Sequence, residues 1–142
     1  MKRFVCSLTF LVLSATLAAA DAQKTKALNS FRASAGLSAL RYSSTLEAAA
    51  ARHANDMLRA RFFSHTGSDG SSVAQRVARA GYSWCFVAEN IAQGQPSLSQ
   101  VMKAWAASPA HLANMLSREV TEFALAQGDG YIWVMVLARP GC

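Results

Sequence analysis

The first residues of the chain have the order of a secretory signal peptide, and this limits how much chain is left to fold. Two basic residues at positions 2 and 3 precede an apolar run over residues 4–17, and three alanines then lead into Asp21. We therefore expect a signal peptide at residues 1–20, cleaved at its end or two residues later, and a mature domain at residues 21–142. The apolar run has 14 residues, fewer than the roughly 20 that a helix needs to span a bilayer. The mature protein is expected to be secreted, to the periplasm or the extracellular space, and not to span a membrane.

The mature chain is small and moderately basic. Residues 21–142 suit one domain with a single hydrophobic core. The whole chain carries 14 Lys and Arg residues against 8 Asp and Glu residues, and without the two basic residues of the signal peptide the net charge is +4. The basic side chains are spread along the sequence without a dense run, so the composition gives no support for nucleic-acid binding.

Helical periodicity and capping residues predict five helices. Apolar residues recur at helical spacing over residues 23–35, and Gly36 follows where a helix end favours the left-handed conformation. Serines followed three residues later by Glu or Gln predict N-terminal capping boxes. The pairs are Ser44 with Glu47, Ser72 with Gln75, and Ser97 with Gln100. A short fifth helix is expected after Ser108-Pro109, because proline fits the first helical position.

Three apolar segments in the second half of the chain predict strands. They are residues 86–92, 123–126 and 131–137, and the last follows the turn-forming sequence Gly128-Asp129-Gly130. Residues 131–137 lack a clean alternation of polar and apolar side chains, so this strand is expected to be covered on both faces. Several helices around a small, late sheet predict an α+β fold, a three-layer α-β-α sandwich.

Two cysteines remain after the signal peptide, Cys85 and Cys142. In an oxidising compartment an isolated even pair most simply forms a disulfide, which would tie the last residue to the middle of the domain. The alternatives are two free thiols or a metal site. The metal site is disfavoured because the two cysteines form no Cys-x-x-Cys pair.

A series of short motifs resembles the bacterial branch of the CAP superfamily, which groups cysteine-rich secretory proteins, antigen 5 and pathogenesis-related 1 proteins, also called SCP domains. The motifs are Ser64-His65-Thr66, Gly70, Arg76, Ala80-Gly81-Tyr82, Ala88-Glu89-Asn90-Ile91-Ala92, Trp105 and Ser108-Pro109-Ala110-His111. Earlier residues fit as well: Asn29, Arg32, Gly36, Leu40, Leu46, Ala50, His53 and Met57. The resemblance covers essentially the whole of residues 21–142.

The resemblance implies an α-β-α sandwich with a small, mainly antiparallel central sheet and a central cleft. In many members, two histidines and two acidic residues of this cleft hold a divalent metal such as zinc. His65 and Glu89 match one histidine and one glutamate of that set, and His111 matches the histidine of the bacterial members. The last histidine of the eukaryotic set falls near Glu122, and the second eukaryotic glutamate has no acidic counterpart. The resemblance thus implies a cleft cluster of His65, Glu89, Asn90, His111 and Glu122.

The residue types themselves allow two interpretations of this cluster. His65, Glu89 and His111 offer imidazole and carboxylate ligands, and an open zinc site needs only three. If Ser108 caps its helix, the helix dipole favours the neutral, ligand-competent form of His111. Alternatively, a half-buried Glu89 needs a polar partner, and His65 or His111 would satisfy it in a purely structural cluster. His53, on the apolar face of the second predicted helix, is expected to be a hydrogen-bonded boundary residue.

Three functions follow from the sequence as hypotheses. The leading one is a non-catalytic secreted binding module, whose cleft binds a lipid, a cell-envelope component or a protein partner. The resemblance to the CAP superfamily implies the lipid in this hypothesis, since members of the family are reported as binders of sterols and other lipids. The second is a metal-assisted hydrolase that uses His65, Glu89 and His111, and the third is a structural envelope protein. The sequence has no Gly-x-Ser-x-Gly or His-Glu-x-x-His motif, so hydrolase chemistry of those kinds has no support.

Overall fold

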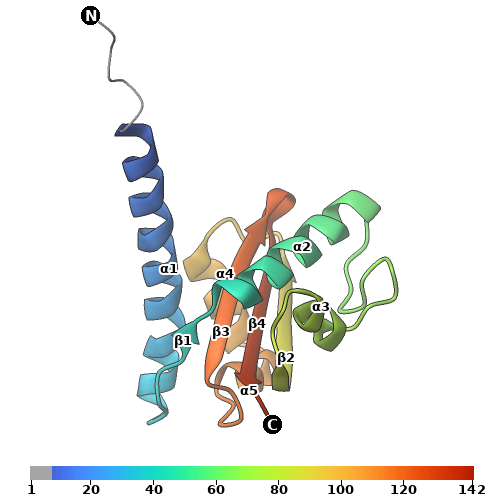
Figure 1. Cartoon of the computed structure of the whole chain (residues 1–142). Helices are drawn as coiled ribbons and strands as arrows, with labels where there is room; N and C mark the ends of the chain where they lie inside the picture. The colour runs from blue at the N-terminus through green and yellow to red at the C-terminus, as the bar shows by residue number, and fades with distance from the viewer. Residues whose placement is uncertain (1–7) are drawn as a thin grey trace, which may run out of the picture.

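Four strands form one sheet at the centre of the molecule, in the order β1-β3-β4-β2 (Figure 1). The computed structural model describes the backbone of residues 8–142 and the side chains of residues 18–142. In chain order the elements are α1 (Leu8–Ser34), β1 (Arg41–Tyr42), α2 (Ser44–Ala60), α3 (Val73–Arg79), β2 (Trp84–Gln93), α4 (Leu98–Ala106), α5 (Pro109–Met115), β3 (Glu122–Gly128), the 3₁₀ turn η1 (Asp129–Tyr131) and β4 (Ile132–Pro140).

The sheet is mainly antiparallel, as expected. β4 lies between β3 and β2 and pairs antiparallel with both, whereas β1 pairs in parallel with β3. Residues 132–138 of β4 are all buried, which confirms that this strand is covered on both faces. β1 has no counterpart among the predicted strands, because its two residues are too few to show a periodic pattern.

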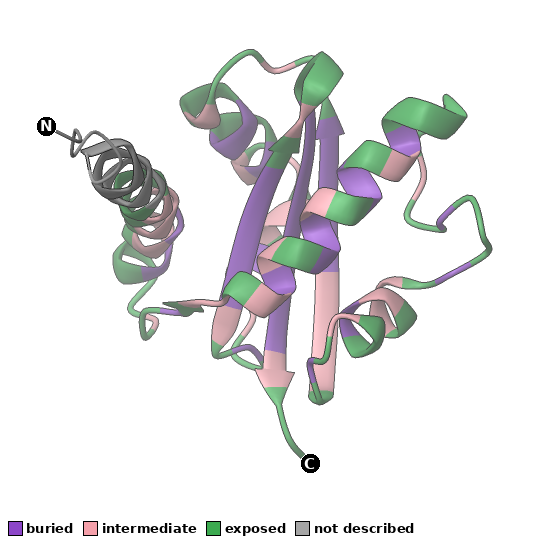
Figure 2. Ribbon diagram, turned by 45° about the horizontal axis from the view of Figure 1, so that its top comes forward, coloured by how far each residue is buried: buried purple, intermediate pink, exposed green. Residues whose placement is uncertain are grey.

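Side chains of the strands alternate between two hydrophobic cores, one on each face of the sheet. Val134 and Val136 of β4 belong to the core under α2 and α3. Met135 and Leu137 belong to the other core, under α1, α4 and α5. Figure 2 shows the buried positions recurring along α2 where it crosses the sheet. The three-layer α-β-α sandwich is therefore confirmed.

The N-terminus of α2 corrects one prediction. Ser43, and not Ser44, is the N-cap residue, and its hydroxyl accepts a hydrogen bond from the Leu46 amide. The reason lies in the sheet, because the Ser43 amide donates to Phe123 O and prolongs the pairing of β1 with β3 by one residue. Helical geometry can begin only after that bond. The carboxylate of Glu47 consequently closes no capping box with Ser44.

The other predicted helix starts agree with the structure. Ser72 and Gln75 form the full capping box of α3. At α4, Ser97 accepts from the Gln100 amide. Pro109 occupies the first turn of α5. After the C-terminus of α1, Gly36 has a φ of +69°, the left-handed conformation that often follows a helix end.

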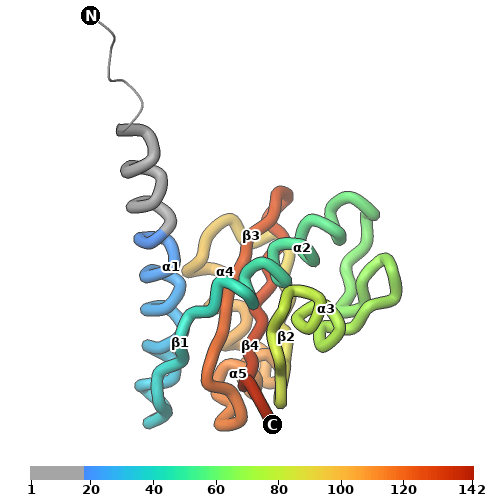
Figure 3. The backbone as a smooth tube through the Cα atoms, viewed as in Figure 1, coloured from blue at the N-terminus to red at the C-terminus, as the bar shows by residue number. Residues whose placement is uncertain are grey.

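The helix α1 is longer than the predicted segment 23–35 and begins at Leu8. The predicted signal peptide lies mostly outside the residues whose side chains are described. The part of α1 that is coloured in Figure 3 runs beside β1. There the Lys24 ammonium donates to Glu47 Oε1 at 2.6 Å and to the Tyr42 hydroxyl at 3.0 Å, which fastens the helix to the domain. Across residues 8–142, helices fall short of the combined length and hydropathy that a bilayer span requires.

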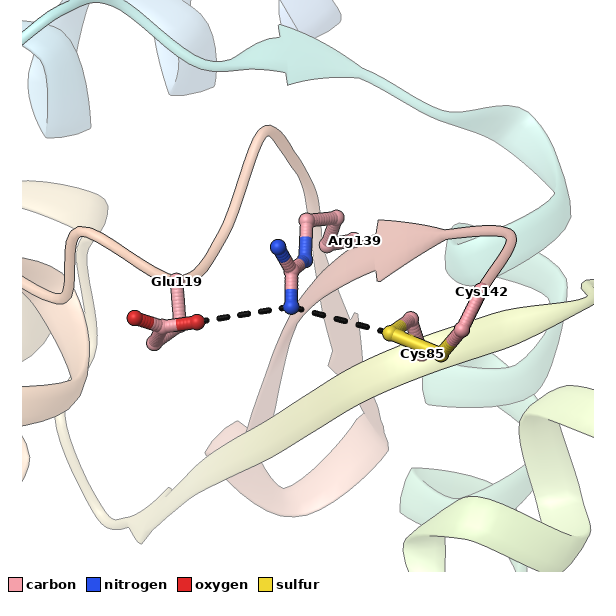
Figure 4. Close-up of a disulfide and its surroundings, with 4 residues drawn as sticks. All are labelled: Cys85, Glu119, Arg139 and Cys142. Atoms are coloured by element: carbon pink, nitrogen blue, oxygen red, sulfur yellow. Dashed lines mark hydrogen bonds and ion pairs between the residues drawn. A yellow bond between two sulfur atoms is a disulfide. The ribbon is translucent and has the colours of Figure 1, made fainter.

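The predicted disulfide is present between Cys85, near the start of β2, and Cys142 (Figure 4). It closes a sequence separation of 57 residues, with the two Cα atoms 5.1 Å apart. The Arg139 guanidinium lies beside it, 3.6 Å from Cys85 Sγ and 3.4 Å from a carboxylate oxygen of Glu119. The bond therefore fixes the end of the chain to the edge strand β2.

Candidate functional site

Glu89 is the centre of a polar cluster on β2. Its side chain is 3% exposed, and both of its carboxylate oxygens are occupied. His65 Nδ1 donates to Oε1 at 2.8 Å, and Arg76 Nη2 donates to Oε2 at 2.7 Å. Because a carboxylate only accepts hydrogen bonds, the proton of this His65 contact is assigned to Nδ1. A buried carboxylate of this kind is tolerated because it is paired and fully hydrogen-bonded.

Arg76 also holds the loop that carries His65. The guanidinium projects from α3 and its Nη1 donates to the carbonyl oxygens of His65 at 3.0 Å and Ser71 at 2.8 Å. One arginine therefore connects α3, the loop after α2 and the carboxylate on β2. The sequence motifs included Arg76, but no feature of the sequence identified it as the partner of Glu89.

His53 reaches the same cluster from α2. Its ring is buried rather than at a boundary, and Nε2 lies 2.9 Å from Ser64 O and 3.9 Å from Glu89 Oε1. Burial lowers the pKa of His53, and the negative charge of Glu89 only partly opposes this effect. The ring is therefore held neutral, with Nε2 donating to the Ser64 carbonyl.

Asn90 and His111 lie on the other face of the sheet. Asn90 is fully buried, and its Nδ2 donates to His111 O at 3.0 Å. Asn114, one turn further along α5, donates from Nδ2 to Asn90 Oδ1 at 2.8 Å. The two amides thus fasten α5 to β2. Asn114 was not among the predicted site residues, although an asparagine three residues after His111 shares its helix face.

The His111 ring is held by a residue at the start of its own helix. Its Nδ1 is 2.9 Å from the Ser108 hydroxyl, and Ser108 makes no side-chain cap of α5. The pKa of His111 is lowered, first by burial and then by the nearby charge of His65. Because Ser108 does not cap the helix with its side chain, the condition for the sequence argument is not met; burial is instead the main cause that favours the neutral ring.

Glu122 does not join this cluster. It lies on β3 opposite Ala138 of β4, whereas Glu89 lies on β2 opposite Val136. Its carboxylate pairs with Arg41 and accepts a hydrogen bond from the Tyr82 hydroxyl at 2.9 Å. Burial and this carboxylate raise the pKa of Tyr82.

The arrangement does not fit the predicted three-ligand metal site. Each Glu89 oxygen already accepts a hydrogen bond from a protein donor, so a metal ion would have to share these oxygens with His65 and Arg76 or displace them. Within the part of the chain whose side chains are described, no three His, Cys, Asp or Glu residues converge in a way that could hold a metal. The set of His65, Glu89 and His111 stays a prediction that this geometry does not support.

A pocket of about 300 Å³ adjoins the cluster on its α2 and α3 side. His53 and Arg76 line it together with Arg52, Asp56 and Asp69. Asp56 accepts from the amide and hydroxyl of Ser68, which lowers the Asp56 pKa and fixes the loop. Carboxylates and guanidinium groups are mixed in this pocket, so it has no uniform charge.

Comparison with known proteins agrees with the sequence motifs. The family of cysteine-rich secretory proteins, CAP, matches residues 25–136. The uncharacterized protein YkwD of Bacillus subtilis strain 168 is 31% identical over 106 residues, which cover 74% of this chain and 41% of that protein.

Solved structures share the fold. An extracellular protein containing an SCP domain from Bacillus anthracis has a TM-score of 0.79 at 22% identity, over 82% of this chain and 39% of that one. An outer surface protein from Borrelia burgdorferi has a TM-score of 0.74 at 20% identity, over 99% of this chain and 100% of that one. The chain thus spans about two fifths of the length of both Bacillus proteins. With a family match over most of its length and the same α-β-α sandwich, the chain belongs to the CAP family of cysteine-rich secretory proteins.

Proposed function

We propose that this protein is a secreted, non-catalytic binding module, and that its ligand is an amphiphile with an anionic head group. The observation that carries the proposal is a groove of about 430 Å³ between α1 and α4. This volume falls within the roughly 300–1,000 Å³ typical of small-molecule sites. The groove lies on the α1 and α4 side of the sheet, away from the Glu89 cluster where the sequence placed a cleft.

The lining of the groove combines apolar and basic side chains. Phe31 of α1 is half-buried and Met102 of α4 is buried, and both supply apolar surface to the groove. Lys26 of α1 and Lys103 of α4 are exposed, so each helix contributes one ammonium group. No acidic residue lines the groove. An apolar chain would remove the hydrophobic surface from water, while a carboxylate or similar head group would meet the two lysines.

Export of the protein is supported by several observations. The B. anthracis and Borrelia relatives are described as an extracellular and an outer surface protein. The Cys85–Cys142 disulfide suits an oxidising compartment. Ala18–Ala20 are exposed, whereas Asp21 is half-buried and bonded to Lys24 and Thr25. Removal of residues 1–20 would therefore keep Lys24, through which α1 contacts Tyr42 and Glu47.

A binding role also agrees with the state of the polar cluster. Glu89 is paired with Arg76 and hydrogen-bonded to His65, so each of its oxygens is engaged by a protein donor. A general acid or base must reach the reacting group within hydrogen-bond distance. The contacts of Glu89 instead join β2 to the loop after α2 and to α3, which favours a structural role.

The proposal is tested with dodecanoate and dodecanol as a matched pair of anionic and neutral amphiphiles. Binding to residues 21–142 is measured by isothermal titration calorimetry below the micellar range. We expect saturable binding of dodecanoate, weakened about tenfold in the double variant Lys26→Gln/Lys103→Gln. Dodecanol should bind both proteins alike, because it lacks the charge. Arg59→Gln, an exposed change on α2, is the control for net charge.

Two results would overturn the proposal. One is the absence of saturable binding of either amphiphile to a folded protein. The other is equal affinity of the wild type and the double lysine variant for dodecanoate, because the two ammonium groups would then play no part. A variant Met102→Glu, which places a carboxylate in the groove, should lose both ligands and shows that they occupy this site.

A further inference from the structure

Arg32 is a buried cation without an acidic partner. The residue is 2% exposed, and its guanidinium donates to three carbonyl oxygens: Nε to Ser38 O at 2.8 Å, and Nη1 to Met115 O at 3.0 Å and Ser117 O at 2.8 Å. No ion pair among the described side chains includes Arg32. The three carbonyl dipoles stabilise the guanidinium, but no negative charge pairs with it inside the domain.

A second arginine faces the same space. A cavity of about 290 Å³ is lined by residues of the loop after α1 and of the segment that joins α5 to β3. In Figure 1 these two backbone segments are found at the lower end of the molecule. Arg32 and the exposed Arg118 both line it, and no acidic residue does. Burial lowers the pKa of Arg32 first, and the like charge of Arg118 lowers it further. Arginine nevertheless stays protonated, so the cavity carries two positive charges and its lining includes no carboxylate.

Donor groups remain for a ligand. The three carbonyl contacts of Arg32 use Nε and Nη1, and Nη2 makes no hydrogen bond within the described part of the chain. The side chain of Arg118 likewise donates to no protein acceptor there. The hydroxyl-bearing residues Ser38 and Thr121 complete the polar part of the lining. Arg118 can therefore offer its planar guanidinium to two oxygens of one oxyanion, whereas Arg32 has only the N–H groups of Nη2 to add.

We propose that this cavity binds a phosphate group between Arg32 and Arg118. A phosphate monoester carries a charge of about −1.5 to −2 at pH 7, which matches the two guanidinium groups better than a single carboxylate does. The volume leaves space for a small substituent beside the phosphate. The ligand is therefore either free phosphate or the phosphate of a small ester, such as a glycerol phosphate unit. This inference is independent of the groove between α1 and α4.

The test measures binding of inorganic phosphate and of glycerol 3-phosphate to residues 21–142 by ³¹P NMR, at constant ionic strength set with sodium chloride. We expect saturable binding of at least one of them, and tighter binding of glycerol 3-phosphate if an ester is the ligand. The Nε–H signal of Arg32 should shift with the same saturation curve. In Arg118→Gln the dissociation constant should rise at least about tenfold, whereas Arg59→Gln should leave it unchanged.

Arg118 is exposed and makes no protein hydrogen bond that the structure describes, so its replacement should not unfold the protein, and a thermal melt verifies this. If neither phosphate compound binds saturably, the proposal is wrong. It is equally wrong if Arg118→Gln binds phosphate like the wild type, or if Arg59→Gln weakens binding as much as Arg118→Gln does. In the last case the effect would be that of net charge alone.

Discussion

Glu89 and Asn90 are consecutive residues of β2, and their side chains join the strand to opposite layers of the sandwich. Glu89 faces α2 and α3, where Arg76 neutralises it, and Asn90 faces α5, where it bonds to the His111 carbonyl. Strand geometry sends neighbouring side chains to opposite faces, so one dipeptide fixes both helical layers to the edge of the sheet.

Replacing Glu89 by Gln should strongly destabilise the fold. The change leaves Arg76, whose side chain is 10% exposed, without its counter-charge, and breaking one side of a buried ion pair costs about 3–5 kcal/mol. Urea unfolding followed by circular dichroism measures the loss. Glu119→Gln is the matched control, because the Glu119–Arg139 pair is on the surface and such pairs contribute about 0–1 kcal/mol. A loss for Glu89→Gln no larger than that of the control would contradict the structural role.

Replacing Asn90 by Ala should loosen α5. The His111 carbonyl loses the Asn90 donor, and the Asn114 amide keeps only its longer bond of 3.4 Å to Glu89 O; an unsatisfied buried group costs about 1–3 kcal/mol. Hydrogen exchange of the α5 amides, measured by mass spectrometry, should speed up more than exchange in α2. Asn114→Ala should show a smaller effect of the same kind. Unchanged exchange in α5 would mean that apolar packing alone holds the helix.

Removal of the disulfide should cost stability without changing the fold. By the chain-entropy account, a closed loop of 57 residues contributes about 4 kcal/mol. Cys85→Ser/Cys142→Ser should melt at a lower temperature, and wild type treated with a reductant should match it. The double variant and the reduced wild type should agree because neither has a bridge that restricts the unfolded chain. If they melt at the temperature of the oxidised wild type, the bond does not constrain the unfolded chain.

Stability should fall as the pH is lowered through the ordinary histidine range. Burial lowers the pKa of His53 and of His111 below the ordinary value of 6.5. Between the folded and unfolded pKa values the unfolded chain therefore binds more protons, so the free energy of unfolding decreases as the pH falls below about 6.5. Urea midpoints between about pH 7.5 and about pH 5 measure the slope across this range. The proton NMR titration of the His111 ring should have its midpoint below 6.5, and a midpoint above it would refute this account.

Metal analysis distinguishes two roles for His65, Glu89 and His111, a structural cluster and the metal site of a hydrolase. Protein purified without a histidine tag and dialysed against micromolar zinc should hold far less than one zinc per chain, because a zinc ion would compete with His65 and Arg76 for the Glu89 oxygens. Plasma mass spectrometry measures the content. Should one zinc per chain be found, and lost in both His65→Ala and His111→Ala, the cluster would be a metal site after all.

Local patterns predicted the elements well and their exact limits less well. Ser72 and Gln75 lie within one turn and cap α3 without help from the rest of the chain, so their spacing was sufficient. Ser43 replaced Ser44 as the cap of α2 because of a hydrogen bond to Phe123, far along the chain. Glu89 was recognisable as a carboxylate in an apolar strand that needs a partner. Which cation supplies that partner depends on how α3 packs, so Arg76 could not be chosen among the other arginines.

The sequence by itself predicted the family and the three-layer architecture, because periodicity and capping residues act over short distances and the motifs act in combination. For Cys85 and Cys142 it made a disulfide the simplest of several outcomes. Only the tertiary structure decided that Glu89 is neutralised by Arg76, that Glu122 belongs with Arg41 and Tyr82, and that Arg32 and Arg118 share a cavity. These relationships join segments far apart in the chain. Burial and charge act there through space, and the order of residues does not record distances in space.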